Sequence, residues 1–471
     1  MRSLPSKLFL FKLAIFACFC AGAPLATSAQ TPIEPDRSEL LNGLRVILLS
    51  RPGEPDVLIK LRVHSGSAFD LAGKAGATAL LGDILFPDPN TREYFTEEMQ
   101  GRLNISTDYD SITITMQGRA REFERIIEIL RTAVVTPQLT PDNFSKARDG
   151  RVKVLKETAI SPGMLADRAI AARLFGDFPY GRPVNGTVES LERVLHTDLM
   201  LVRDRFLNPN NATVAIVGGV QPSRALRALR QLLGGWRKSE QIVPTTFRQP
   251  VDPDPRILVV GAPGDQSLEV RLAVRGLARK DPDSVAVALL TKVMHERWEK
   301  ALPELSRGPV FVRHDALMLP GMLVMGATAE HLIAGKVLGT AQDVMKSLVA
   351  SPVSNAELEQ AKLETLTAWN KERSTPEGMV NAWLDTDTYG VVSAAEQMRV
   401  MNGVTPNDLR RVAERLFRNA AIASVVVGNS ELAKASVERY GKVELLGEVG
   451  SRDSTRPTQP PSQPQIKTRP E

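Results

Sequence analysis

The sequence predicts an α+β protein of two homologous domains, each a mainly antiparallel sheet packed with helices. Three observations lead to this fold class. The chain has 471 residues, 43% of them hydrophobic, which is enough for more than one core. Segments near the start and the end of its first half recur about 210 residues later, and a proline-rich stretch separates the two copies. Similarity of a chain to itself at a fixed spacing indicates a repeated structural unit.

The start of each half contains two apolar runs around a Pro-Gly-acid turn. LRVILLSRPGEPDVLIKLRV (44–63) is similar to PRILVVGAPGDQSLEVRLAV (255–274). Apolar runs bounded by turn residues are typical of strands, and two runs joined by a short turn predict a β-hairpin. We therefore expect a hairpin at the start of each half.

The end of each half repeats as well. TDLMLVRDRFLNPNNATVAIVGG (197–219) is similar to NDLRRVAERLFRNAAIASVVVGN (407–429). Each segment has apolar residues at i, i+3 and i+4, then a short loop, then a run of Val and Ile that stops at Gly218 or Gly428. This pattern predicts a helix followed by a strand.

Composition shifts divide the chain further. Residues 237–256 hold four prolines and little apolar periodicity, as a linker does, and the last residues are rich in Pro, Ser and Gln, as disordered segments are. The predicted organisation is a signal peptide at 1–29, an N-terminal domain at 30–236, a linker at 237–256, a C-terminal domain at 257–447 and a disordered Pro-rich tail at 448–471.

The N-terminus has the order of a secretory signal. Basic residues precede an apolar run at 13–23, and the small residues that follow predict cleavage after Ala29. The run is too short to span a bilayer comfortably, so we expect no transmembrane segment and a periplasmic or secreted protein. A lipid anchor on Cys18 is the alternative, although Phe16 fits such a signal poorly.

Composition excludes several classes of function. Both cysteines, Cys18 and Cys20, lie in the signal, so the mature chain has neither a thiolate metal site nor a cysteine nucleophile. Loss of the three basic signal residues lowers the formal net charge from +5 to +2. With 5% aromatic residues and no basic block, the chain gives no support to nucleic-acid binding.

Residues 77–85, ATALLGDIL, predict a helix with two stripes. The apolar stripe at 77, 80, 81, 84 and 85 should face a core. On the second stripe lie Ala79, Gly82 and Asp83. Two histidines one turn apart with a glutamate between them would bind zinc and activate water there. The five histidines of the chain, at 64, 196, 295, 314 and 331, form no such pair anywhere.

The chain nevertheless resembles the insulinase/pitrilysin (M16) family of zinc metallopeptidases, in the short-chain branch that includes the mitochondrial processing peptidase. The resemblance lies in VHSGSAFDLAGKAGATALLGDILF (63–86), in GDFPYGRPVNGTVESL (176–191) and in the closing helix and strand of each half. It implies the LuxS/MPP-like metallopeptidase fold over residues 40 to 430. The domains at 30–236 and 257–447 would then both be M16-like.

The resemblance also implies that the catalytic groups are absent. The family's His-x-x-Glu-His motif falls on Ala79, Gly82 and Asp83, and its third zinc ligand falls on Glu157, the one ligand-type residue that remains. The family's substrate clamp, an Arg and a Tyr, falls on Glu304 and Phe311, although Arg307 could replace the arginine if the register slips. The second-half segment AVALLTKVM (286–294) aligns with 77–85, so the first helix has come to look like its structural counterpart.

The resemblance implies a non-catalytic subunit that pairs with an M16 chain bearing the intact motif, to form a peptide-degrading or processing chamber in the bacterial envelope. We expect zinc only in that partner and no cofactor in this chain. Two alternatives stay open. One is an autonomous peptide-binding or scaffold protein of the cell envelope. The other is a hydrolase with non-zinc chemistry, in which Asp70, Asp83 and Glu157 would hold a hard cation.

Overall fold

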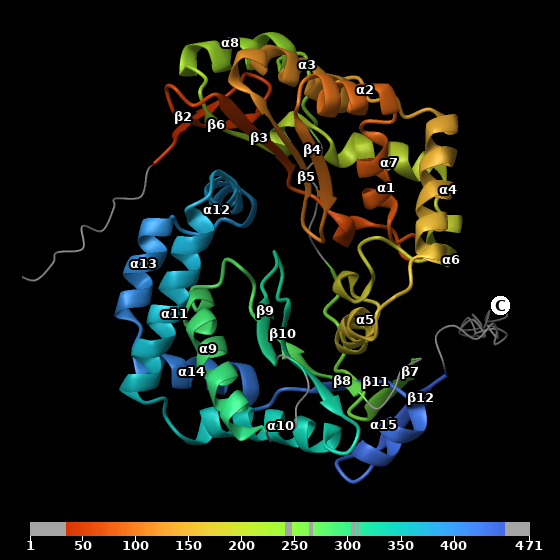
Figure 1. The fold of residues 1–471 in the computed structure, drawn as a ribbon, viewed down its shortest axis with the longest axis vertical. Helices are drawn as coiled ribbons and strands as arrows, with labels where there is room; N and C mark the ends of the chain where they lie inside the picture. Colours follow the sequence, from red (N-terminus) through yellow and green to blue (C-terminus); the bar gives the residue numbers. More distant parts are fainter. Residues whose placement is uncertain (1–33, 241–246, 263–266, 303–307, 309, 448–471) are drawn as a thin grey trace, which may run out of the picture. The chain divides into compact units, whose positions relative to one another are not determined.

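The computed structural model describes residues 34–447 except 241–246, 263–266, 303–307 and 309 (Figure 1). The predicted signal peptide and tail, Glu304 and Arg307 therefore lie outside the described residues. Two six-stranded sheets, each packed with helices, account for the fold. The predicted class, α+β with a repeated sheet-and-helix unit, is confirmed, and each sheet is mainly antiparallel.

The first half contains strands β1 to β6 and helices α1 to α8. Its sheet has the order β1-β2-β6-β3-β5-β4. The strands are β1 (Asp36–Glu39), β2 (Arg45–Ser50), β3 (Asp56–Val63), β4 (Arg102–Thr107), β5 (Ile112–Arg119) and β6 (Ala212–Gly218). The helices are α1 (Ala77–Ile84), α2 (Pro89–Glu93), α3 (Phe123–Val134), α4 (Pro141–Glu157), α5 (Pro162–Phe175), α6 (Val188–Glu192), α7 (His196–Phe206) and α8 (Pro222–Leu233). Short helical turns are η1 (Ser67–Phe69), η2 (Tyr94–Glu98), η3 (Ala120–Glu122), η4 (Pro179–Gly181) and η5 (Pro209–Asn211).

The second half repeats this plan. Its sheet has the order β12-β7-β11-β8-β10-β9. The strands are β7 (Ile257–Gly261), β8 (Ser267–Arg275), β9 (Phe311–Asp315), β10 (Met322–Glu330), β11 (Ala423–Gly428) and β12 (Val443–Leu446). The helices are α9 (Ser284–Ala301), α10 (Ala334–Ala350), α11 (Asn355–Arg373), α12 (Pro376–Tyr389), α13 (Ala394–Gly403), α14 (Pro406–Phe417) and α15 (Ser430–Val437). Among the described helices, none is long and apolar enough to cross a membrane.

The predicted hairpin at the start of each half is wrong. β2 and β3 are strands as expected, but β6 lies between them, parallel to β2 and antiparallel to β3. In the second half, β11 separates β7 from β8 in the same way. The reason is that β6 and β11 are apolar and buried along their whole length. Each buries more apolar surface in the centre of its sheet than at an edge, and this stabilises the observed order over direct pairing of the two neighbouring strands. The predicted closing helix and strand are confirmed as α7–β6 and α14–β11.

Glycine ends the two central strands for a steric reason. Gly218 and Gly428 both have positive φ, +142° and +150°. A Cβ on Gly218 would lie 2.3 Å from the backbone oxygen of Asp56, and one on Gly428 would lie 2.4 Å from Leu268 Cδ2. Both positions therefore require glycine, and their equivalence supports the structural repeat.

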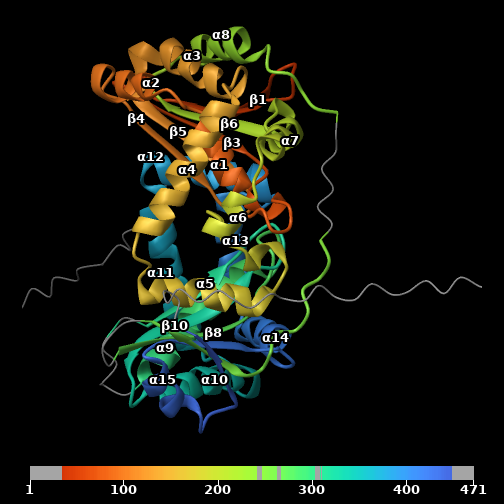
Figure 2. The ribbon, with the colours of Figure 1, turned by 90° about the vertical axis from the view of Figure 1, so that its right-hand side faces the viewer.

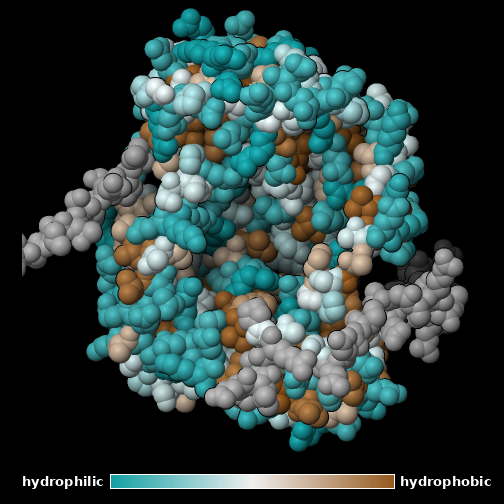
Figure 3. All heavy atoms as spheres, in the orientation of Figure 1, coloured by the Kyte–Doolittle hydropathy of each residue, from teal (hydrophilic) through white to brown (hydrophobic). Residues whose placement is uncertain are grey.

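Each sheet has one face covered by helices of its own half. On the first sheet, apolar side chains of β2, β3, β5 and β6 pack with α1, α3, α7 and α8. Hydrophilic residues cover the outer side of this layer where α3 and α8 lie (Figure 3). On the second sheet, the corresponding layer is formed by α9, α10, α11, α14 and α15. Figure 2, turned by 90° from Figure 1, shows α3 and α8 stacked over the first sheet.

The opposite face of each sheet is covered by a helix of the other half. The apolar side of α5 packs on β8 and β11, with Ile170 and Leu174 fully buried there. The apolar side of α12 packs on β3 and β6 through Val380 and Leu384. Both helices have 14 residues and begin with a proline that follows a capping Ser or Thr. The two prolines, Pro162 and Pro376, are 214 residues apart in the sequence. The two halves therefore exchange equivalent helices.

Charged side chains on the strands complete this exchange. On the first sheet, Lys60 donates to Asn381 (2.9 Å) and Glu377 (2.7 Å) of α12. On the second sheet, Arg271 donates to Asp167 of α5 (2.7 Å). Lys60 and Arg271 occupy equivalent strand positions, and both are buried. A buried ammonium or guanidinium is costly unless it is paired, so these contacts fix where each exchanged helix lies.

Candidate functional site

Helix α1 begins on a buried carboxylate. Asp70 accepts hydrogen bonds from the backbone N–H of Gly76 (2.7 Å) and from both the N–H (2.9 Å) and the hydroxyl (2.6 Å) of Thr78. Burial raises the pKa of Asp70 to about 6, against the opposing effect of these hydrogen bonds. Gly76 takes the left-handed conformation that the tight turn needs, with φ +95°. Asp70 therefore holds the first turn of α1 in place.

The expected apolar stripe of α1 is buried as predicted. Ala77, Leu80, Leu81, Ile84 and Leu85 are each 2% exposed or less. The other stripe carries the three positions to which the zinc motif would belong, and it faces β4 and α4.

Two of the three motif positions have no group that could bind or activate anything. Ala79 is 1% exposed and ends at its methyl group. At Gly82 a Cβ would already lie 3.2 Å from Thr107 Oγ1 and 3.4 Å from Ile105 Cγ2. α1 and β4 therefore pack more closely than a longer side chain at position 82 would allow without adjustment.

The third position, Asp83, pairs with Arg151 of α4. Its carboxylate accepts from Arg151 Nε at 2.7 Å, and Nη2 lies 2.7 Å from the same oxygen. Arg151 Nη2 also donates to the carbonyl oxygen of Ala79 (3.3 Å), and Nη1 donates to Asn185 Oδ1 (2.9 Å). One guanidinium thus joins the motif turn of α1, the helix α4 and the 176–191 segment.

This arrangement does not fit a zinc ion. Zinc needs several nitrogen, sulfur or carboxylate ligands around one point. At the motif turn the only ligand-type side chain is Asp83, and it is already engaged by a cation. Among the described residues, no group of three or more His, Cys, Asp or Glu could hold a metal ion. A positive guanidinium within bonding distance of Asp83 would repel a divalent cation at the same place.

Glu157, the predicted residual ligand-type position, is not brought to α1. It is the last residue of α4, its side chain is 65% exposed, and Lys153 of the same helix lies 3.9 Å away. Six helical residues separate it from Arg151, about 600° of rotation, so the two side chains leave α4 in different directions. Asp70, Asp83 and Glu157 consequently have separate partners, and the carboxylate cluster of the non-zinc alternative is not formed.

Sequence reasoning missed Arg151, although a signal for it existed. On α4 the stripe Phe144, Ala147, Arg151 and Leu155 has i, i+3, i+4 spacing, and Arg151 is its single charged member. A charged residue within an apolar stripe indicates a partner on the facing element. The position of Arg151 within this stripe was therefore a signal, readable from the sequence, for a partner of the altered motif.

The 176–191 segment supports the same turn from the other side. Arg182 Nη1 donates to the backbone oxygen of Asp70 (3.0 Å). A Cβ on Gly76 would lie 2.9 Å from the backbone oxygen of Asn185. Tyr180 is buried and donates to Asp110 (3.1 Å), whose other oxygen accepts from the N–H of Met318 in the second half (2.9 Å). The segment thus connects the motif turn to the second half.

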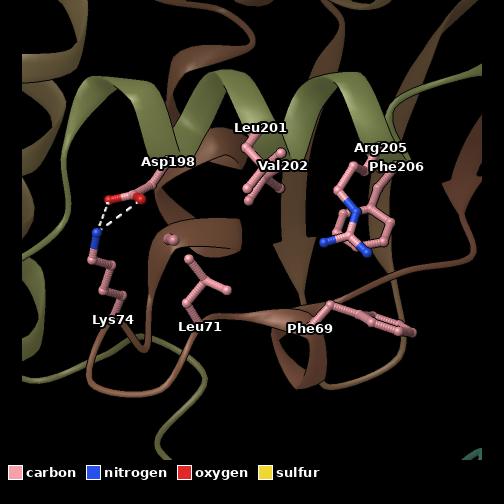
Figure 4. A pocket seen from close by; sticks show the side chains of 9 residues that line it. Phe69, Leu71, Lys74, Asp198, Leu201, Val202, Arg205 and Phe206 are labelled. Atoms are coloured by element: carbon pink, nitrogen blue, oxygen red, sulfur yellow. Dashed lines mark hydrogen bonds and ion pairs between the residues drawn. The ribbon is translucent and has the colours of Figure 1, made fainter. Parts of the chain in front are cut away.

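The loop before α1 is tied down by an ion pair. Figure 4 shows Lys74 reaching Asp198 of α7, with distances of 2.8 and 2.6 Å to the two carboxylate oxygens. Phe69, Leu71 and Phe206 surround the adjacent cavity, whose volume is about 10 Å³. Such a space holds about one water molecule, so this cavity is a packing gap and not a ligand site.

A larger groove runs beside the Arg151 contact. It has a volume of about 680 Å³ and lies between α1, α4 and the 86–92 segment. Its lining combines apolar residues with three basic ones, Arg92, Lys146 and Arg151. The groove is therefore large enough for a short extended peptide, next to a motif that has no hydrolytic group.

Of the two predicted clamp positions, only Phe311 belongs to the described residues. It is the first residue of β9, and its ring lies 4.9 Å from the guanidinium carbon of Arg271 and 5.4 Å from that of Arg313. Its ring also covers Gly326, where a Cβ would lie 2.2 Å from the ring. Phe311 has no hydroxyl with which to hold a substrate carbonyl, and its ring packs on the sheet.

The chain is similar to known proteins of one family. The profile described as "Insulinase (Peptidase family M16)" matches residues 45–188, and the one described as "Peptidase M16 inactive domain" matches residues 196–364. An uncharacterized zinc protease of Mycobacterium tuberculosis is 26% identical over 347 residues, which cover 70% of this chain and 78% of the relative. Subunit 1 of the mitochondrial cytochrome b-c1 complex of Homo sapiens is 24% identical over 230 residues, 47% of this chain and 48% of the relative.

Solved structures show the same fold. The crystal structure of a peptidase M16 inactive domain from Pseudomonas fluorescens has a TM-score of 0.74 at 18% identity, covering 84% of this chain and 98% of that one. The crystal structure of a protease from Helicobacter pylori has a TM-score of 0.75 at 17% identity, covering 84% and 99%.

The chain belongs to the M16 family and is a member that lacks the His-x-x-Glu-His motif. The resemblance inferred from the sequence is thereby confirmed.

Proposed function

We propose that this chain is the non-catalytic subunit of a two-chain peptidase of the cell envelope, in which an M16 chain with an intact zinc motif supplies the chemistry. The observation that carries the proposal is the Arg151 contact. At the motif turn, one internal guanidinium joins Asp83, Ala79 and Asn185, while both halves of the scaffold are retained. A protein that keeps the whole scaffold but fills its motif turn in this way is suited to binding and not to hydrolysis.

The edge of the first sheet supports a role in holding peptide. β4 is an edge strand that pairs only with β5 among the described strands, and alternate residues of it are exposed. An extended peptide can add to such an edge through backbone hydrogen bonds. Because Gly82 packs against Ile105 and Thr107 of β4, a peptide on this edge would pass beside the motif turn.

An exposed helix surface supports the presence of a partner. α4 has 17 residues, of which Phe144 alone is buried, and Val154 in its last turns is 60% exposed. Ile160 and Met164 continue this apolar surface along the chain, at 38% and 52% exposure. One of the relatives is a subunit of a larger complex, the cytochrome b-c1 complex, which supports assembly as a property of similar chains.

The test is purification and reconstitution. The tagged mature chain is isolated from the envelope of its own source, and the proteins that accompany it are identified. Hydrolysis of fluorogenic peptides is then measured for the chain alone, the accompanying M16 chain alone and the two together. We expect no hydrolysis by this chain alone. The pair should hydrolyse the peptides at least about tenfold faster than the partner alone, because the loss of one contact that positions the substrate changes the rate by about that factor.

A partner whose motif Glu is replaced by Gln is the matched control and should abolish all activity. Stoichiometric zinc and hydrolysis in the isolated chain would contradict the proposal. Purification as a lone homo-oligomer that binds peptides would instead establish the autonomous peptide-binding alternative. Hydrolysis without zinc would establish the third alternative, at a place other than the carboxylates discussed above.

A further inference from the structure

The second half contains an open cavity of about 600 Å³ between α9, α11, α12 and α13. These four helices lie next to one another in Figure 1. The α9 residues Ser284, Ala288 and Thr291 form one wall, and the ends of α11 and α12 form the opposite one. The cavity belongs to neither the α1–α4 contact nor the β4 edge.

The internal repeat places this cavity at the counterpart of the motif turn. ATALLGDIL and AVALLTKVM align at a spacing of 209, so Ala288 corresponds to Ala79 and Thr291 to Gly82. Both second-half residues line the cavity. The repeated unit therefore presents the same helix face twice, once against Arg151 and once against open space.

The helix that faces α9 differs from its first-half counterpart at the position of Arg151. α11 packs on α9 as α4 packs on α1, and the capping residues Thr140 and Ser354 set the spacing at 214. Thr365 then takes the place of Arg151. It is 3% exposed, and its hydroxyl has no partner among the described residues. Thr365 does not line the cavity, whose α11 wall is formed by Trp369, Glu372 and Arg373.

Arg373 at the end of α11 brings a positive charge to this cavity. Its Nη2 donates to Gln397 (2.7 Å), and its guanidinium carbon lies 5.0 Å from the ring centre of Trp369. No ion pair links Arg373 to a carboxylate of the described part of the chain. Burial lowers the pKa of Arg373, and the nearby carboxylate of Glu372 acts in the opposite direction. A half-buried guanidinium in this situation is stabilised by an incoming carboxylate.

The acidic residues of the lining are mostly neutralised already. Asp281 pairs with Arg415 (2.8 Å), and Asp385 pairs with Arg62 (2.6 Å) and Arg279. Glu396 pairs with an arginine one turn further along α13. Glu372 has an exposed side chain, as does Lys280 of opposite charge. Arg373 therefore has no hydrogen-bonded carboxylate among the described residues, and the neighbouring Glu372 offsets part of its charge.

The remaining lining suits a carboxylate that is attached to an apolar group. Val285, Ala288, Val392 and Val400 supply apolar surface near Arg373. His314 accepts from the N–H of Leu277 through Nε2 (3.1 Å), so the neutral ring carries its proton on Nδ1. The described residues offer no acceptor to Nδ1, which leaves it as a second donor.

We propose that this second-half cavity binds the C-terminal carboxylate of a peptide, with Arg373 as its ionic partner and the apolar wall in contact with the last side chain. The proposal rests on the proposed peptide-binding function and adds to it a fixed point for one end of the peptide. A peptide anchored there by its C-terminus could not extend further in that direction, so the site would favour free ends over internal segments.

The test uses the mature full-length chain and two probes. They are the peptide Gly-Ala-Leu-Val-Phe with fluorescein on its N-terminus, once with a free C-terminal carboxylate and once as the C-terminal amide. Binding is measured by fluorescence anisotropy. We expect the acid to bind at least about tenfold more tightly than the amide, as a hydrogen-bonded charge pair implies.

Arg373→Gln should weaken binding of the acid to the level of the amide, whereas Arg410→Gln, on exposed α14, should leave the difference intact. Equal affinity of acid and amide for the wild-type chain, absence of binding by both, or a preserved difference in Arg373→Gln would each overturn the proposal. If circular dichroism shows that Arg373→Gln is unfolded, Ala288→Phe decides the matter. It fills the cavity, and unchanged binding of the acid to it would overturn the proposal.

The outcomes separate this proposal from the proposed function. Partner-dependent hydrolysis without discrimination between acid and amide would leave the function standing and remove the anchor. Discrimination by a chain that has no M16 partner would do the reverse.

Discussion

Replacement of Arg151 by alanine should lower the free energy of unfolding through the loss of contacts in the first half. The guanidinium joins the motif turn of α1, helix α4 and Asn185 of the 176–191 segment. Its loss leaves the Asp83 carboxylate without its partner, 41% exposed. Asp83 can then be solvated, so the penalty of a buried unpaired charge does not arise.

The magnitude follows from the individual contacts. An ion pair with one partner this exposed contributes no more than about 1 kcal/mol to the free energy of unfolding. The two hydrogen bonds to Asn185 Oδ1 and the Ala79 carbonyl together add about 1 kcal/mol after competition with water. The expected destabilisation is therefore about 2 kcal/mol. For a domain of about 200 residues this lowers the transition temperature by about 4–8 °C.

Differential scanning calorimetry of the mature chain measures this change, and Lys153→Ala is the matched control. Lys153 lies on the same helix, is 72% exposed and has its nearest ionic partner 3.9 Å away. The control should shift the transition by less than about 1 °C, since such exposed pairs contribute little. A double replacement of Arg151 and Asp83 should cost about 1 kcal/mol less than the sum of the single ones.

A shift in Arg151→Ala no larger than that of the control would refute the reasoning. It would mean that the guanidinium contacts exchange with water without net gain. Arg151 would then be a surface residue, and the motif turn would be held by Asp70 and the apolar stripe alone.

Two further predictions concern the same half. Restoration of the motif by A79H, G82E and D83H should yield a chain with almost no zinc after dialysis, because Arg151 remains beside the site. Addition of R151E should bring the zinc content to about one equivalent by elemental analysis, and equal zinc in both variants would contradict this. His64 has a pKa lowered to about 3 by burial, with Arg45 and Arg62 adding to the effect. Folding favours the neutral form of His64. The free energy of unfolding is therefore unaffected by this group above about pH 6.5 and decreases as the pH falls toward 3, by about 2 kcal/mol at pH 5. The variant H64Q should lose this part of the pH dependence in urea unfolding measured at pH 7.5 and 5, and an unchanged dependence would exclude His64 as its source.

The sequence was sufficient for the repeat, the fold class and most strands and helices. Local patterns determine these features. The apolar stripe at 77–85 predicts a helix and the Val-rich runs before Gly218 and Gly428 predict strands, and the structure has these elements as α1, β6 and β11. Local patterns could not predict the order of the strands in each sheet. Placement of β6 between β2 and β3 depends on a strand about 150 residues away, and a short Pro-Gly-acid turn looks the same whether or not its flanking strands pair.

At the candidate site, the sequence identified which motif positions had changed, but it did not identify the contacts that the new residues make. Ala79, Gly82 and Asp83 follow from alignment within the chain and with the family. The contact between Asp83 and Arg151 depends on which face of α4 meets α1, and alignment with the family pointed instead to Glu157, on another face of the same helix. Long-range pairing of side chains requires the packing geometry, which no periodicity within one element supplies.

The exchange of α5 and α12 accounts for how the motif could be lost while the scaffold was kept. Each sheet has one face buried by its own helices and the other by a helix of the opposite half. Most of the buried apolar surface therefore stabilises the fold irrespective of what occupies the turn of α1. What that turn still requires is a link between α1 and α4, and in the described structure Arg151 supplies it. In the second half α9 and α11 have a charged link of their own at another position, because Arg297 of α9 donates to both carboxylate oxygens of Glu357 of α11 (2.7 and 3.1 Å). The two halves therefore join equivalent helices through ion pairs at different positions, and in the second half neither partner of the pair lines the cavity beside Ala288 and Thr291.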